Sequence, residues 1–73
     1  MTTNELAQIF KDRYHTAPKG LVVTTIHLFG IEFADALSGQ PLKEICARAS
    51  VPVSYYTEIH KGIRLAEFVS IKR

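Results

Sequence analysis

Residues 42–61, with the sequence LKEICARASVPVSYYTEIHK, predict two short helices that meet at a sharp turn. The turn falls at residues 50–52, because proline ends a helix rather than continuing it. Small side chains at Cys46 and Ala49 allow two helices to approach closely at a steep angle, and Val51 fills the corner between them. This segment therefore predicts a tightly packed helical corner.

The rest of the chain is divided at two further points, APKG at 17–20 and SGQP at 38–41, since glycine and proline at such spacing end helices. No segment between these points alternates polar and apolar residues with the period of two that is typical of a β-strand. The sequence therefore predicts an all-α fold, a small compact bundle of about four to five helices forming one domain over residues 1–73.

The first helix is expected from about Asn4 to Tyr14, with Thr3 as its N-cap, because a threonine hydroxyl can accept a hydrogen bond from the first turn. The second helix is expected from about Leu21 to Leu37. Its apolar stripe recurs at steps of three and four residues and consists of Val22, Ile26, Phe29, Phe33 and Leu37.

Leu28 and Ile31 lie off this stripe, on a face that an isolated helix would fill with polar side chains. Two explanations fit the pattern equally well. Either another segment of the chain, such as the C-terminal one, covers these side chains, or they form the contact between two copies of the protein. The second explanation predicts a homodimer with Leu28 and Ile31 in its interface.

The third helix is expected from Pro41 to about Ala49, because proline suits the first position of a helix. The fourth is expected from residue 52 or 53 to Lys61. Gly62 is expected to follow its end, because glycine tolerates the positive φ that is common there. The remaining segment is expected to return apolar side chains to the core, namely Leu65, Phe68 and Val69.

Composition argues against several classes of protein. The single cysteine, Cys46, cannot form an internal disulfide, which fits a reducing compartment. Together with three scattered histidines it lacks the paired spacing of a tetrahedral zinc site, so we expect no metal and no other cofactor. No segment approaches the roughly 20 apolar residues of a membrane span, and the N-terminus does not resemble a signal peptide. We expect a cytoplasmic, nucleoid-associated protein without a membrane partner.

The charge and the absence of catalytic motifs also limit the function. The net charge of +2 permits a nucleic-acid partner without requiring one. No glycine-rich phosphate loop, pair of catalytic carboxylates or nucleophile elbow is present in the sequence. We therefore expect that the protein is not an enzyme and has no small-molecule substrate.

Residues 42–61 resemble the helix-turn-helix of bacterial and phage transcriptional regulators. The apolar and small positions of that motif are occupied here by Ile45, Cys46, Ala49, Ser50, Val51, Tyr56 and Ile59. Two of them depart from the family pattern, because Ser50 stands where glycine is usual and Tyr56 stands where valine or isoleucine is usual. The resemblance implies that the second helix of the motif enters the major groove of double-stranded DNA.

The resemblance also implies which side chains contact DNA. The base edges would be met by Val53, Ser54, Thr57, Glu58 and Lys61. The sugars and phosphates would be met by Tyr55, Lys43, Arg48 and Arg64, with support from Lys72 and Arg73. The implied function is sequence-specific transcriptional regulation. The alternatives are a module that docks a larger regulator or polymerase, and a helix face that is only solvated.

Overall fold

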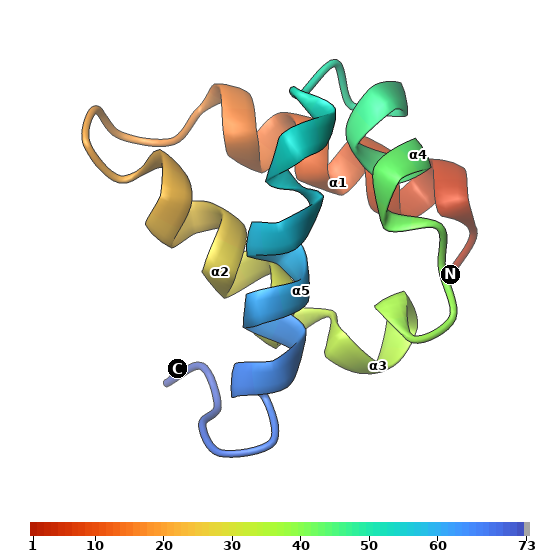
Figure 1. Cartoon of the computed structure of the whole chain (residues 1–73). Helices are drawn as coiled ribbons and strands as arrows, with labels where there is room; N and C mark the ends of the chain where they lie inside the picture. The colour runs from red at the N-terminus through yellow and green to blue at the C-terminus, as the bar shows by residue number, and fades with distance from the viewer. Residues whose placement is uncertain (73) are drawn as a thin grey trace.

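The computed structural model describes residues 1–72, and every regular element in that range is helical (Figure 1). Along the chain the elements are α1 (Thr3–His15), α2 (Val22–Glu32), α3 (Ala34–Leu37), α4 (Leu42–Arg48), the 3₁₀ helix η1 (Val53–Tyr55) and α5 (Tyr56–Leu65). The predicted all-α bundle is confirmed. Arg73, which the resemblance suggests as a phosphate contact, lies outside the described residues.

The hydrophobic core lies where α5 and α1 pack on α2 and where α1 packs on α4 (Figure 1). Its buried members are Leu6, Ala7, Phe10, Ile26, Phe29, Leu37, Ile45, Cys46, Ala49, Val51 and Ile59. The rings of Phe10 and Phe29 stack with their centroids 4.8 Å apart, which ties α1 to α2. The core therefore includes three of the five apolar positions predicted for residues 21–37, and the other two, Val22 and Phe33, pack against it.

The N-terminus of α1 lies one residue earlier than predicted, because Thr2 and not Thr3 is its N-cap. The Thr2 hydroxyl accepts a hydrogen bond from the Glu5 N–H (3.1 Å), and the Glu5 carboxylate accepts one from the Thr2 N–H (2.7 Å). These bonds lower the pKa of Glu5, the backbone bond having the larger effect. A cap at Thr3 would place Leu6 at the reciprocal position, where no carboxylate is available.

The predicted continuous helix over 21–37 is wrong, because it breaks at Phe33 into α2 and α3. Phe33 has a φ of −108° and a ψ of 22°, outside the range of a regular α-helix. The break turns α3 towards α5, which it contacts, and brings Leu37 into the core. Arg13 of α1 lies over the Phe33 ring at 5.3 Å from the centroid and binds Glu32 through two hydrogen bonds of 3.0 and 2.9 Å.

The predicted chain breaks at 17–20 and 38–41 are confirmed, and both contain a glycine with positive φ, Gly20 at 84° and Gly39 at 78°. The start of the following helix differs by one residue from the prediction. Pro41 has an extended ψ of 94° and precedes α4 as its N-cap, so the helix begins at Leu42.

The predicted end of the fourth helix at Lys61, with Gly62 just beyond it, is wrong, since α5 continues to Leu65. Gly62 is buried where α5 crosses α2, directly against Gly30. A Cβ atom built on Gly62 lies 2.9 Å from the Gly30 Cα and closer still to the carbonyl oxygen of His27. The residue is therefore placed by a close approach of two helix backbones and not by the geometry of a helix end.

The expectation that the C-terminal segment returns its apolar side chains to the core is also wrong. The exposed fractions are 42% for Leu65, 82% for Phe68 and 49% for Val69. The buried side of α5 carries Ile59 and Gly62, and the core is already filled by residues between Leu6 and Ile59.

Candidate nucleic-acid interface

The turn between α4 and η1 keeps the left-handed geometry that glycine usually provides, although Ser50 stands there with a φ of 58°. The Ser50 N–H donates to the Ala47 carbonyl (3.2 Å), and the Val51 N–H donates to the Cys46 carbonyl (2.9 Å). This pair of bonds is a Schellman motif. An apolar contact between the residues in the positions of Val51 and Cys46 usually accompanies the motif, and both of these side chains are buried. The turn therefore ends α4 sharply and sets the direction of the next helix.

Beyond the turn the chain forms η1 before it becomes regular α-helix, so the helix expected from residue 52 or 53 begins only at Tyr56. Ile59 is fully buried, as predicted, and Tyr56 is partly buried. The Lys43 ammonium lies 5.0 Å from the centroid of the Tyr56 ring, which is a cation–π contact between α4 and α5. The bulky Tyr56 is thus accommodated at the edge of the α4–α5 contact and not in the core.

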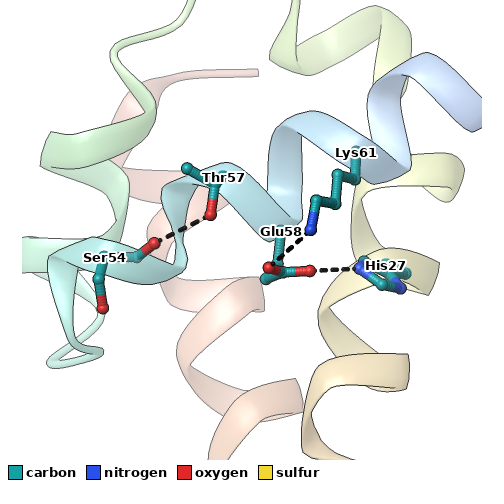
Figure 2. A network of polar contacts seen from close by, with 5 residues as sticks. All are labelled: His27, Ser54, Thr57, Glu58 and Lys61. Carbon is teal, nitrogen blue, oxygen red and sulfur yellow. Dashed lines mark hydrogen bonds and ion pairs between the residues drawn. The ribbon is translucent and has the colours of Figure 1, made fainter.

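The outer face of η1 and α5 exposes most of the side chains that the resemblance assigns to base contacts. Val53 is 43% exposed, and Ser54 and Thr57 are exposed as well. The Thr57 hydroxyl donates to the Ser54 carbonyl (3.1 Å), which orients it along the helix (Figure 2). The side chain of Lys61, one turn beyond Thr57, is 63% exposed.

Glu58 differs from this group, because its side chain is turned towards α2 and is only 19% exposed (Figure 2). One carboxylate oxygen lies 2.7 Å from Nε2 of His27, and the other accepts a hydrogen bond from Lys61 (3.2 Å). The bond with His27, followed by the bond with Lys61, lowers the pKa of Glu58. The carboxylate therefore stays ionised below its usual titration range.

Sequence patterns alone do not single out His27, which has the character of a surface or boundary histidine 31 positions before Glu58. The contact between His27 and Glu58 can be inferred only once the crossing of α2 and α5 is known. Glu58 lies one helical turn before Gly62, and Gly62 faces α2, so Glu58 must face α2 as well.

The remaining side chains predicted to contact DNA differ in their exposure and in the contacts that hold them. Tyr55 is partly buried, and its ring centroid lies 6.0 Å from that of Tyr14. Arg48 donates to the Asn4 side chain (2.6 Å) and pairs with Glu44 (2.6 Å). Arg64 is exposed in the last turn of α5.

The charge of the segment from α4 to α5 is positive but modest. Its charged side chains are the basic Lys43, Arg48, Lys61 and Arg64 and the acidic Glu44 and Glu58. Residues 42–64 therefore carry a net charge of +2 with neutral histidines, which equals the net charge of the whole chain. The net positive charge of the chain therefore comes from the segment that contains the candidate interface, because the basic and acidic side chains outside it balance.

The two side chains suggested for a subunit contact have different surroundings. Leu28 is 44% exposed on α2. Ile31 is half-buried and lines a groove together with Val69, Ser70 and Ile71 of the C-terminal segment. The C-terminal segment therefore adjoins Ile31, while Leu28 remains exposed and could contact a second copy of the chain.

Three further observations on residues 1–72 concern metal binding, the Cys46 thiol and membrane insertion. That range contains no group of three or more His, Cys, Asp or Glu side chains placed to hold a metal ion. Burial raises the pKa of the Cys46 thiol, so this thiol is protonated and a poor nucleophile. None of the helices in the same range has the length and apolar character needed to cross a membrane.

A comparison with protein-family models finds one that is described as an HTH-like domain, and it matches residues 2–72. HTH abbreviates helix-turn-helix, so the match extends the resemblance from the twenty-residue motif to almost the full chain. No curated protein and no solved structure matches this sequence.

Proposed function

The chain belongs to the HTH-like domain family, and from this premise we propose that it binds double-stranded DNA as a sequence-specific transcriptional regulator. The observation that carries the proposal is the outer face of η1 and α5. A sharp turn at Ser50 sets the direction of η1 and α5, and the side chains of Ser54, Thr57 and Lys61 on these elements are exposed. In helix-turn-helix proteins the corresponding helix lies in the major groove.

The side chains on this face match the chemistry of base edges. The Ser54 hydroxyl can both donate to and accept from base edges. The Thr57 hydroxyl, whose proton is donated to the Ser54 carbonyl, can accept a hydrogen bond from a base amino group. Lys61 can reach a guanine or a phosphate. The phosphate backbone would be held by Lys43, Arg48, Arg64 and the phenol of Tyr55, which supply charge or hydrogen bonds without sequence information.

Substitutions at Thr57 and Lys61 test the reading face. Thr57→Ala should change the free energy of unfolding by no more than about 0.5 kcal/mol, because the side chain is exposed. It should weaken binding to the preferred duplex by about 1–3 kcal/mol and hardly affect binding to random duplex. Lys61→Ala should weaken both if it meets phosphate, and it should reduce the salt slope of log Kd by about one unit. Fluorescence anisotropy over a salt series, on a duplex selected from a random library, measures both effects.

Lys11→Ala is the matched control, because Lys11 is an exposed lysine on α1. It should leave DNA affinity unchanged apart from a small effect of net charge. Normal binding by the double variant Thr57→Ala, Lys61→Ala would contradict the reading-face assignment.

A protein-docking module is the second candidate, and the exposed apolar side chains after Arg64 favour it. Phe68 is 82% exposed and Leu65 and Val69 are nearly half exposed, which is unusual for side chains without a partner. This candidate predicts no binding to random duplex even at low salt. The same anisotropy series on the unaltered protein therefore separates the two functions.

We further propose that the regulator is a homodimer with Leu28 and Ile31 in its interface. The proposal is supported by the 44% exposure of the apolar Leu28 side chain on α2. The double variant Leu28→Ser, Ile31→Ser should be a folded monomer, as measured by sedimentation equilibrium and far-UV circular dichroism. Val23→Ser, at an exposed apolar site elsewhere on α2, should leave the dimer intact. Unfolding of the double variant would instead mean that the pair stabilises the single chain, and the dimer proposal would lose its basis. In the dimer the two α5 helices should lie about 34 Å apart, to meet successive major grooves.

A further inference from the structure

The contact between His27 and Glu58 joins α2 to the helix proposed to read DNA (Figure 2). An ionised carboxylate can only accept hydrogen bonds, so Nε2 of His27 must carry the proton and donate it to Glu58 over 2.7 Å. The second oxygen of Glu58 is engaged by Lys61 at 3.2 Å. Both oxygens of this carboxylate are thus bound within the protein.

This arrangement places the Glu58 carboxylate between two partners, and its ion pair with Lys61 has members of very different exposure. The side chain of Glu58 is 19% exposed and lies against α2, whereas that of Lys61 is 63% exposed. Figure 2 shows Glu58 between His27 and Lys61, with Thr57 on the adjoining part of the helix. Lys61 is paired with this carboxylate in the structure, and a carboxylate that stood free on the outer face would in addition repel DNA phosphates.

We propose that His27 is a positioning residue for DNA binding, which holds the Glu58 carboxylate against α2 and away from the phosphate backbone of DNA. The inference rests on the proposed function and gives a role to a residue outside the helix-turn-helix segment. It also assigns Glu58 a different role from the base contact that the resemblance implies, because a carboxylate held on both oxygens is withdrawn from the DNA.

A purely structural role for His27 makes a different prediction. The pair is partly exposed, with side-chain exposures of 30% and 19%, and such pairs stabilise a fold only weakly. Loss of the pair should therefore change DNA binding far more than it changes the melting temperature. Releasing Glu58 should also be harmless once its charge has been removed.

Four variants test the inference: His27→Ala, His27→Gln, Glu58→Gln and the double variant His27→Ala, Glu58→Gln. Each is measured for binding to random duplex and to the preferred duplex over a salt series, and for its melting temperature. His27→Ala should weaken binding on the order of threefold to tenfold at low salt and lower the salt slope by about one unit, because it releases one negative charge towards the phosphates. His27→Gln should restore binding, because a glutamine amide also donates an N–H over a similar reach.

The double variant should bind as well as the unaltered protein, since the neutral amide that replaces the carboxylate does not repel phosphate. Glu58→Gln alone should bind random duplex at least as well as the unaltered protein. A loss of affinity for the preferred duplex in Glu58→Gln that persists in the double variant would overturn the inference, because Glu58 would then contact a base. A loss in His27→Ala that follows the melting temperature and is not restored by Glu58→Gln would overturn it as well.

Failure of the inference is distinguishable from failure of the proposed function. If the unaltered protein binds DNA and His27→Ala binds equally well, the inference alone is overturned. If the unaltered protein binds no duplex at any salt concentration, both are overturned.

Discussion

Gly62→Ala should lower the free energy of unfolding by about 3 kcal/mol or more, which is an effect at the upper end for a single added methyl group. The new Cβ would lie 2.9 Å from the Gly30 Cα and closer to the His27 carbonyl oxygen, and neither backbone atom can move aside without shifting a helix. In an exposed helix interior the same change normally stabilises by about 1 kcal/mol, because alanine is the better helix former. The steric clash therefore reverses the usual sign.

The consequence for a chain of this size should be large. A domain of 73 residues is expected to have roughly 4–11 kcal/mol of stability, so much of it would be lost. Urea unfolding followed by circular dichroism measures the change. Gly30→Ala should lower the free energy of unfolding by a similar amount, since its Cβ would lie 2.5 Å from the Ile59 carbonyl oxygen.

Gly20→Ala provides the control for this prediction. Gly20 has a φ of 84° and open space around its Cβ position, so alanine there meets backbone strain alone, worth about 1–2 kcal/mol. Gly62→Ala should cost clearly more than Gly20→Ala. An equal or smaller loss at Gly62 would mean that α2 and α5 do not approach as closely as described.

Phe29→Ala should lower the free energy of unfolding by about 3–5 kcal/mol, because it removes a fully buried ring from the middle of α2. Phe29 stacks on Phe10 at 4.8 Å and lies 5.4 Å from the Phe33 ring, so its loss removes one ring contact from each of them. The cavity cannot close easily, since the neighbouring side chains are held by three helices. Thermal and urea unfolding measure the effect.

Val23→Ala is the matched control, because Val23 is an apolar residue of the same helix and is 42% exposed. Its substitution should change stability by less than about 1 kcal/mol. Similar losses at Val23 and Phe29 would contradict the assignment of Phe29 to the core. DNA binding by Phe29→Ala should fall only in proportion to the unfolded fraction, which distinguishes it from Thr57→Ala.

The sequence by itself determined the helical class and the helix-turn-helix segment, because both depend on short-range patterns. The spacing of Ile45, Ala49 and Ile59 indicates which sides of two adjacent helices face each other, and all three side chains are buried. The sharp turn follows from local chemistry too, since the bonds that close it join residues no more than five positions apart. Ser50 keeps the left-handed geometry because those bonds require it.

Only the tertiary structure decided the features that depend on contacts between distant segments. A glycine after Lys61 fits a helix end as well as it fits a close crossing, and the presence of Gly30 opposite Gly62 decides for the crossing. The break at Phe33 and the exposure of Phe68 depend in the same way on how much of the core other segments already fill. The pairing of His27 with Glu58 across 31 positions follows from that crossing, because two helices in backbone contact bring the side chains one turn away together. No periodicity within either helix carries that information, since it resides in the packing of one helix on the other.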